Sequence, residues 1–130
     1  MQGPCHIIRS SAFPIGSGED TETNPGVFGR SLANYVAAQV QSRGWHVEAV
    51  IPEDFGYCVM LSRRPLTLWI GCGNRNGSTT EWMAFVVAEG APLKRALRLL
   101  DLSNEVSRVS DVLGEILQSA PGVEEYFIES

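Results

Sequence analysis

The sequence predicts an α+β fold: a two-layer sandwich in which a mainly antiparallel sheet of about five strands packs on two long helices, in the order β-α-β-β-β-β-α. Apolar residues recur at helical spacing over residues 28–40 and again over 106–117. Between these stripes, four strand-like segments follow one another through short connections. The 130 residues contain no evident linker or repeat, so we expect one domain, 1–130.

The first expected elements are a strand and a helix. Residues 5–15 contain isoleucine and phenylalanine together with a proline, which predicts a strand at an edge of the sheet. Asn24 can cap a helix, and Pro25 suits the first helical position because its ring already holds the required φ. Gly44 can end the helix, so we expect it to span residues 25–43.

Four strands are expected in the centre of the chain. They alternate in hydrophobicity or are apolar throughout, and turn residues such as proline, asparagine and glycine separate them. Because the connections are short, neighbouring strands should pair as an antiparallel meander. The expected strands are His46–Ile51, Phe55–Leu61, Leu66–Cys72 and Thr80–Ala88.

The C-terminal third predicts a second helical region. Residues 93–100 form a first helical stretch, and Ser103 is positioned to cap a following helix. Apolar residues from Val106 to Leu117 then fall on one helical face, and Pro121 ends the helix. Residues 123–128 fit either a short strand or a docked tail, and the sequence does not decide between them.

The negative charge of the chain is concentrated near its C-terminus. The net charge is −5, and residues 101–130 contain one basic and seven acidic side chains. An acidic protein with a pI near 4.9 is a poor partner for phosphates, so we expect no nucleic-acid binding. Four acidic residues lie off the apolar stripe of the last helix, and this acidic face is a candidate surface for a protein partner: Asp101, Glu105, Asp111 and Glu115.

Other patterns exclude several classes of protein. The longest apolar run, Trp82–Ala88, is seven residues, whereas a membrane helix needs about 20. No signal-peptide pattern is present, so we expect a cytoplasmic protein without membrane contact. Cys5, Cys58 and Cys72 lack the spacing of a disulfide framework or a zinc site, so we expect reduced thiols, no metal and no cofactor.

The candidate binding residues are carboxylates and aromatic side chains in the central strands. Glu53 and Asp54 stand at the entry of an expected strand and could contact a basic partner or act in acid–base chemistry, or they could simply form a turn. The aromatic candidates are Phe55, Tyr57, Trp69 and Trp82, and an exposed tryptophan would mark a binding surface.

No convergent catalytic set is evident in the sequence. Cys58 and Cys72 occupy positions of equal parity on two neighbouring expected strands and could share a sheet face. With His6 or His46, one of these thiols could form a nucleophile–base pair, but no third, orienting group is indicated. We therefore predict no catalytic residues.

Three segments carry a resemblance to a known family. Residues 23–33, 52–57 and 69–73, with Glu81 and Trp82, resemble a family of small bacterial, proteobacterial-type proteins without an established activity. The second segment of that family has the form Glu-Asp-Trp-Gly-Trp, and Phe55 and Tyr57 stand here at the two tryptophan positions. The resemblance covers roughly residues 20–90. It implies a bacterial, cytoplasmic protein and supplies no catalytic residues.

Three functional hypotheses follow from these patterns. The leading one is a non-enzymatic module that binds another protein. The alternative is a small enzyme or small-ligand-binding domain that uses the sheet face near Glu53, Asp54, Trp69 and Trp82. A further alternative is an immunity-type or chaperone-like partner of a specific bacterial protein. Because two helices would leave part of a five-stranded sheet uncovered, we also expect a homodimer through that face or an edge strand.

Overall fold

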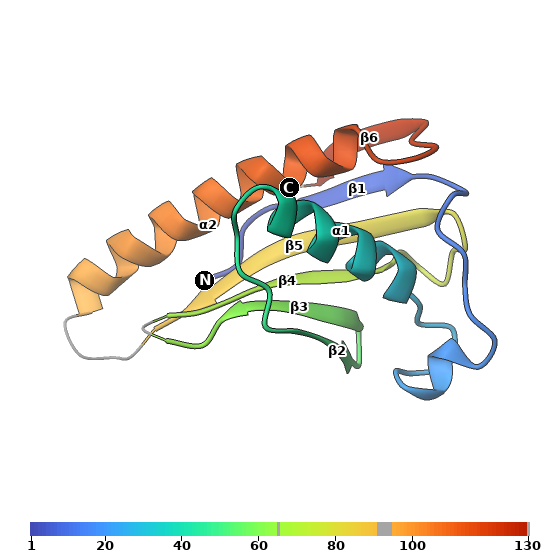
Figure 1. Ribbon diagram of the computed structural model, residues 1–130, viewed down its shortest axis with the longest axis horizontal. Coiled ribbons are helices and arrows are strands. Elements are labelled where there is room, and N and C mark those ends of the chain that lie inside the picture. Colours follow the sequence, from blue (N-terminus) through green and yellow to red (C-terminus); the bar gives the residue numbers. More distant parts are fainter. Residues whose placement is uncertain (65, 91–94, 130) are drawn as a thin grey trace.

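The described residues of the chain form six strands and two α-helices (Figure 1). In the computed structural model of the chain, the backbone is described for residues 1–64, 66–90 and 95–129, and side chains for the same ranges except 95–101. In chain order, the elements are β1 (Cys5–Arg9), η1 (Glu19–Thr21), α1 (Arg30–Ser42), β2 (Ala49–Glu53), β3 (Gly56–Ser62), β4 (Thr67–Asn74), β5 (Glu81–Glu89), α2 (Arg95–Gln118) and β6 (Glu125–Glu129).

The strands form one antiparallel sheet in the order β2-β3-β4-β5-β1-β6. The predicted α+β class, the antiparallel sheet and the order of the first seven elements are confirmed. The expected count of about five strands is too low, because residues 125–129 pair with β1 as a sixth strand. The expectation that the first strand lies at an edge is wrong, since β1 is held between β5 and β6.

Both helices contribute to one hydrophobic core. Helix α1 contacts β3 and β4, whereas α2 contacts β5 and β1. The core side chains of the sheet come from alternate positions of each strand, such as Val59, Ile70 and Val86, and they pack against Leu32 of α1 and Leu113 of α2. The intervening residues point away from the helices, and we call the surface that they form the outer face.

Helix α1 begins five residues later than the sequence predicts. Residues 25–29 are not helical, and the helix runs from Arg30 to Ser42. Gly26 has a φ of 79°, which interrupts a right-handed helix, and the N–H of Val27 donates to the carbonyl of Asn24 in a local turn. Asn24 therefore lies within the loop that leads to α1, and a different residue caps the helix. With 13 residues, α1 does not confirm the expectation of two long helices.

Helix α2 joins two segments that the sequence separates. It runs for 24 residues from Arg95 to Gln118 without a break at Ser103, which lies inside the helix. Leu102 is buried in the core together with Val106, so the apolar stripe of the helix extends to the N-terminal side of Ser103. This packing outweighs the preference of Ser103 for a helix N-cap. Residues 93 and 94 of the expected first stretch lie outside the described residues. In the described part of the chain, no helix has the length and apolarity needed to span a membrane.

Two glycines allow loops to close on the end of β4. Gly29 precedes α1, Gly56 begins β3, and both have positive φ values, 153° and 149°. A Cβ atom added to Gly29 would lie 2.8 Å from the carbonyl oxygen of Cys72, and one added to Gly56 would lie 2.2 Å from the same oxygen. Backbone therefore packs directly on backbone from two directions, a contact that only glycine permits.

This contact predicts a large effect of a single methyl group. Gly56→Ala should lower the free energy of unfolding by at least about 2 kcal/mol, because the added Cβ clashes with backbone and the φ is unfavourable for alanine. Denaturant unfolding of the purified variant measures the change. Gly16→Ala is the matched control, since its added Cβ would lie no closer than 3.5 Å to another residue. Equal effects of the two substitutions would contradict the proposed constraint.

Candidate functional site

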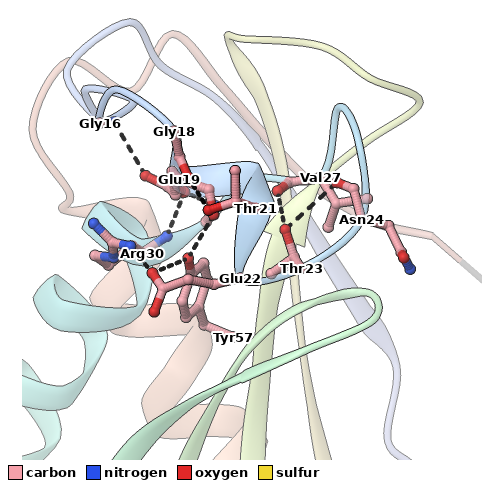
Figure 2. A network of polar contacts seen from close by, with 11 residues as sticks. Gly16, Gly18, Glu19, Thr21, Glu22, Thr23, Asn24, Val27, Arg30 and Tyr57 are labelled. Atoms are coloured by element: carbon pink, nitrogen blue, oxygen red, sulfur yellow. Dashed lines mark hydrogen bonds and ion pairs between the residues drawn. The ribbon is translucent and has the colours of Figure 1, made fainter.

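A buried carboxylate organises the corner where α1 begins (Figure 2). Glu19 lies in η1 and is 2% exposed. One carboxylate oxygen accepts the N–H of Gly29 at 2.8 Å and of Arg30 at 3.1 Å, and the other accepts the N–H of Gly16 at 3.2 Å. These bonds satisfy donors at the helix N-terminus and place a negative charge where the helix dipole favours it. Glu19 thus fulfils the helix-capping role that the sequence predicts for Asn24.

A second set of contacts joins this corner to β3. Arg30 forms an ion pair with Glu22, and its guanidinium lies 5.7 Å from the centroid of the Tyr57 ring. The Tyr57 hydroxyl can donate a hydrogen bond to either of two acceptors, the Glu19 carbonyl at 3.4 Å or a Glu22 carboxylate oxygen at 3.3 Å. Burial raises the pKa of Tyr57, so its hydroxyl remains a donor at neutral pH. Figure 2 shows these side chains converging between η1, α1 and β3.

The same corner holds the turn between β2 and β3. The Asn24 side-chain amide donates to the carbonyl of Asp54 at 3.2 Å. The backbone of Phe55 packs closely against Gly73 of β4. A Cβ added to Gly73 would lie only 2.4 Å from the Phe55 carbonyl oxygen. Phe55 is thereby held against the end of β4. The three segments quoted for the family resemblance thus meet at this corner of the fold.

Asn74 connects the loop before α1 to the end of β4. Its side-chain oxygen accepts the N–H of Phe28 at 3.0 Å, and its side-chain nitrogen donates to the carbonyls of Gly26 at 2.9 Å and Ser78 at 3.0 Å. Asn74 is buried, so these bonds satisfy backbone groups that water does not reach. Asn74 therefore fixes the loop that leads into α1 to the end of β4, through Gly26 and Phe28.

Three aromatic rings pack together on the outer face. The ring centroids of Phe55 and Trp69 are 5.7 Å apart with the planes inclined by 24°, and Phe85 lies 5.5 Å from Phe55 and 5.9 Å from Trp69. A Cβ added to Gly71 would lie 2.5 Å from the Phe85 ring, so the missing side chain lets this ring lie over β4. We call Phe55, Trp69 and Phe85 the aromatic cluster.

The structure divides the sequence-predicted aromatic residues between the two faces. Phe55 and Trp69 are half-buried and lie together in the aromatic cluster. Tyr57 and Trp82 are 2% and 1% exposed and belong to the core beneath the helices. The indole N–H of Trp82 donates to the Ser10 carbonyl at 3.0 Å, which satisfies its polar atom inside the core.

The remaining predicted residues lie at the margins of the fold. Glu53 and Asp54 are exposed at the turn between β2 and β3. On α2, Asp111 and Glu115 are exposed and Glu105 is half-buried, whereas the side chain of Asp101 lies outside the described residues. Arg108 donates to Glu105 at 3.4 Å, so one positive charge lies within the acidic face. The acidic face thus lies on α2 and not on the sheet.

Beyond the aromatic cluster, the outer face carries both charged and apolar side chains, and four of its apolar residues are already buried at 1–7% exposure: Ile7, Cys58, Met60 and Val87. Arg75 crosses this face between Glu81, at 2.6 Å, and Glu129, and its guanidinium lies 5.7 Å from the centroid of Phe127. The charges near β1 and β6 are therefore largely paired. By strand register, the apolar residues of this face are Ile7, Ile51, Cys58, Met60, Trp69, Met83, Phe85, Val87 and Phe127.

The two central cysteines do not share a sheet face. Cys72 pairs with Tyr57 and lies in the core, whereas Cys58 pairs with Gly71 and lies on the outer face. The parity expectation is wrong because cross-strand partners of β3 and β4 have opposite parity in this register. Burial raises the pKa of Cys58 to about 11 and also raises the pKa of Cys72. Both thiols are therefore protonated at neutral pH and are poor nucleophiles.

The sequence did not indicate a buried polar cluster around His6. One ring nitrogen lies 2.8 Å from the Tyr126 hydroxyl and the other lies 2.8 Å from the Ser110 hydroxyl. His6 is 2% exposed, and burial lowers its pKa although Asp111 acts to raise it. The neutral ring donates at one nitrogen and accepts at the other, so both positions are used to join β1, α2 and β6. Residues so distant in the chain give no local signal of this contact.

The structure offers two further observations on ligand chemistry. A hollow of about 320 Å³ lies beside the start of α1, and Glu19, Arg30, Ser31 and Asn34 are among its lining residues. Both Glu19 oxygens already accept backbone N–H groups there, and Arg30 is paired with Glu22. Among the residues with described side chains, no three of His, Cys, Asp and Glu are grouped so as to hold a metal ion.

We predict that the Glu19 cap contributes measurably to stability. Glu19→Gln replaces one acceptor oxygen by an N–H₂ group that faces backbone donors, so the free energy of unfolding should fall by about 1–3 kcal/mol. Thermal and denaturant unfolding provide the measurement. Glu53→Gln is the control, because that carboxylate is exposed, and it should change stability by less than about 0.5 kcal/mol. A Glu19 variant as stable as the control would show that the cap is dispensable.

The His6 cluster predicts a specific pH dependence. Since the pKa of His6 is lowered in the folded protein, the unfolded chain binds more protons near pH 6, and stability should fall as the pH drops below about 6.5. Unfolding experiments between pH 5 and 8 would show this slope, and His6→Gln should reduce it. His46→Gln alters an exposed histidine and should retain the slope. A slope that survives His6→Gln would assign the dependence to other groups.

Comparison of the chain with protein-family models, with curated proteins and with solved structures finds no match.

Proposed function

We propose that this protein is a non-enzymatic binding module that contacts another protein through the outer face of its sheet. The observation that supports the proposal is the aromatic cluster on a face to which α1 and α2 contribute no core packing. On this interpretation the sheet and helices are a two-layer sandwich, and the partner supplies the missing cover. Aromatic side chains at the centre of a surface are the residues that most often dominate binding energy.

The outer face is suited to binding because it is already ordered. Gly71 allows the Phe85 ring to lie over β4, and the close backbone contact at Gly73 holds Phe55 in place. The rings therefore lose little conformational freedom when a partner covers them. Burial of their remaining apolar surface would contribute about 25 cal/mol per Å² before the costs of association. A rigid aromatic centre thus favours a protein surface of matching shape.

The enzyme alternative has less support from the same geometry. It invokes Glu53, Asp54, Trp69 and Trp82, but Trp82 is buried in the core on the opposite face from Trp69. Glu19 uses both carboxylate oxygens as a helix cap, and His6 uses both ring nitrogens within its cluster. An immunity-type or chaperone-like role is a special case of the binding function and would use the same outer face.

Site-specific photo-crosslinking tests the proposal. A benzophenone amino acid introduced at Met83, a half-buried residue of the outer face, should give covalent adducts with a protein in bacterial cells that produce the chain. The same probe at exposed Glu115 of α2 is the control and should give at least fivefold less adduct. Excess unlabelled protein should compete for the Met83 adduct.

Two outcomes would argue against binding through the outer face. One is the absence of adducts from Met83 in a variant whose thermal unfolding matches the parent protein. The other is equal adduct formation from Met83 and Glu115, which would indicate contacts without preference for the sheet. Trp69→Ala should also lower the Met83 adduct if the aromatic cluster carries the binding energy, provided that the variant remains folded.

A further inference from the structure

We infer that the partner of the outer face is a second copy of this chain, packed face to face about a two-fold axis. This inference rests on the proposed binding function and names the partner. It depends on two features of the face, namely the distribution of charge at its two ends and its area.

Opposite charges flank the two ends of β3. Glu53 and Asp54 lie at the turn that leads into Gly56, and Arg63 and Arg64 follow Ser62 at the other end. All four side chains are exposed. The seven residues of β3 separate the two pairs by about 20 Å at the rise of an extended strand. Glu53 and Asp54 thus lie at one end, whereas the other end holds Arg63 and Arg64 together with two carboxylates, Glu48 and Glu89.

These charges are close enough to the outer face to influence it. Cys58 lies on the outer face between the two ends, and burial is the main cause that raises its pKa. The Glu53 carboxylate raises that pKa further, whereas the Arg63 guanidinium lowers it. Arg63 is already paired with Glu48 at 2.6 Å, so Arg64 is the more available cation. Within the described residues, the side chains of Arg64 and Glu53 make no hydrogen bond or ion pair.

The charge distribution selects one orientation of the two copies. A two-fold axis that lies in the interface and runs perpendicular to the strands places β3 over β3 of the second copy with its ends exchanged. Glu53 and Asp54 of one copy then face Arg63 and Arg64 of the other, twice by symmetry. An axis parallel to the strands would instead bring like ends together. Electrostatic complementarity therefore favours the perpendicular axis, and the aromatic clusters meet near its centre.

The outer face is just large enough for a dimer of the smallest standard size. Six strands of five to nine residues form a face of about 600 Å² per copy, from a strand spacing of about 4.8 Å and a rise of about 3.3 Å per residue. Because Ile7, Cys58 and Met60 are already buried within one copy, two such faces bury at most about 1,200 Å², which is the lower limit of a standard specific interface. Packed antiparallel sheets commonly stack in this way about 10 Å apart. A dimer of moderate, micromolar affinity is expected from this area.

Charge reversal provides the decisive experiment. Sedimentation velocity of the purified chain over a wide concentration range, at low salt, should show a reversible monomer–dimer equilibrium. Glu53→Arg alone or Arg64→Glu alone should weaken the dimer about tenfold, because each places like charges opposite one another at both ends. An equimolar mixture of the two variants should recover dimerisation as a heterodimer, since the two substituted side chains then face each other with opposite charges and the native pair is retained at the other end. Glu115→Arg on α2 should leave the equilibrium unchanged.

The outcomes separate this inference from the function on which it rests. A chain that stays monomeric at every concentration, while Met83 crosslinks to a different protein, would overturn the second-copy inference and retain the binding function. A dimer that is insensitive to both charge reversals, or a mixture that fails to recover, would also overturn the face-to-face arrangement. A monomer without Met83 adducts would overturn both proposals.

Discussion

Two loops pack closely against the Cys72 carbonyl group near the end of β4, and the rest of the structure depends on this contact. Gly29 and Gly56 both pack against the Cys72 carbonyl, where a Cβ atom would clash. Gly29 brings the start of α1 within reach of the Glu19 carboxylate, and Gly56 sets the turn that places Phe55 beside Trp69. A core contact, a helix cap and a surface cluster therefore share one backbone constraint, and loss of that contact would affect all three.

The two faces of the sheet have different chemistry. Beneath the helices, buried polar groups such as His6, Glu19 and Asn74 are hydrogen-bonded within the protein. On the outer face, aromatic and aliphatic side chains lie between charged residues at the ends of the strands. Because the polar groups on the helix side of the sheet already act in folding, we place the proposed binding surface on the outer face, which the helices do not cover.

The sequence allows much of the fold to be predicted and only part of the candidate site. Phe55 and Trp69 are two of the predicted binding residues, and they lie together on the outer face. Phe85 was missed because both faces of β5 are apolar, so alternation does not show which residues the helices cover. The same prediction covers Tyr57 and Trp82, but strand register places them in the core. Glu19 and His6 act through partners distant in the chain, and local spacing cannot reveal such contacts.

Local periodicity by itself determined the α+β class and the two helical stripes, short connections determined the antiparallel central strands, and composition determined the acidic C-terminal region. These features depend on neighbouring residues, whose spacing the chain fixes directly. Only the tertiary structure decided that residues 125–129 pair with β1, that Cys58 and Cys72 lie on opposite faces, and that Glu19 caps α1. Each of these results depends on register or on contact between distant segments. A shift of one residue in strand pairing would exchange the two faces of a strand. The aromatic cluster therefore lies on the outer face because of the register that tertiary packing selects.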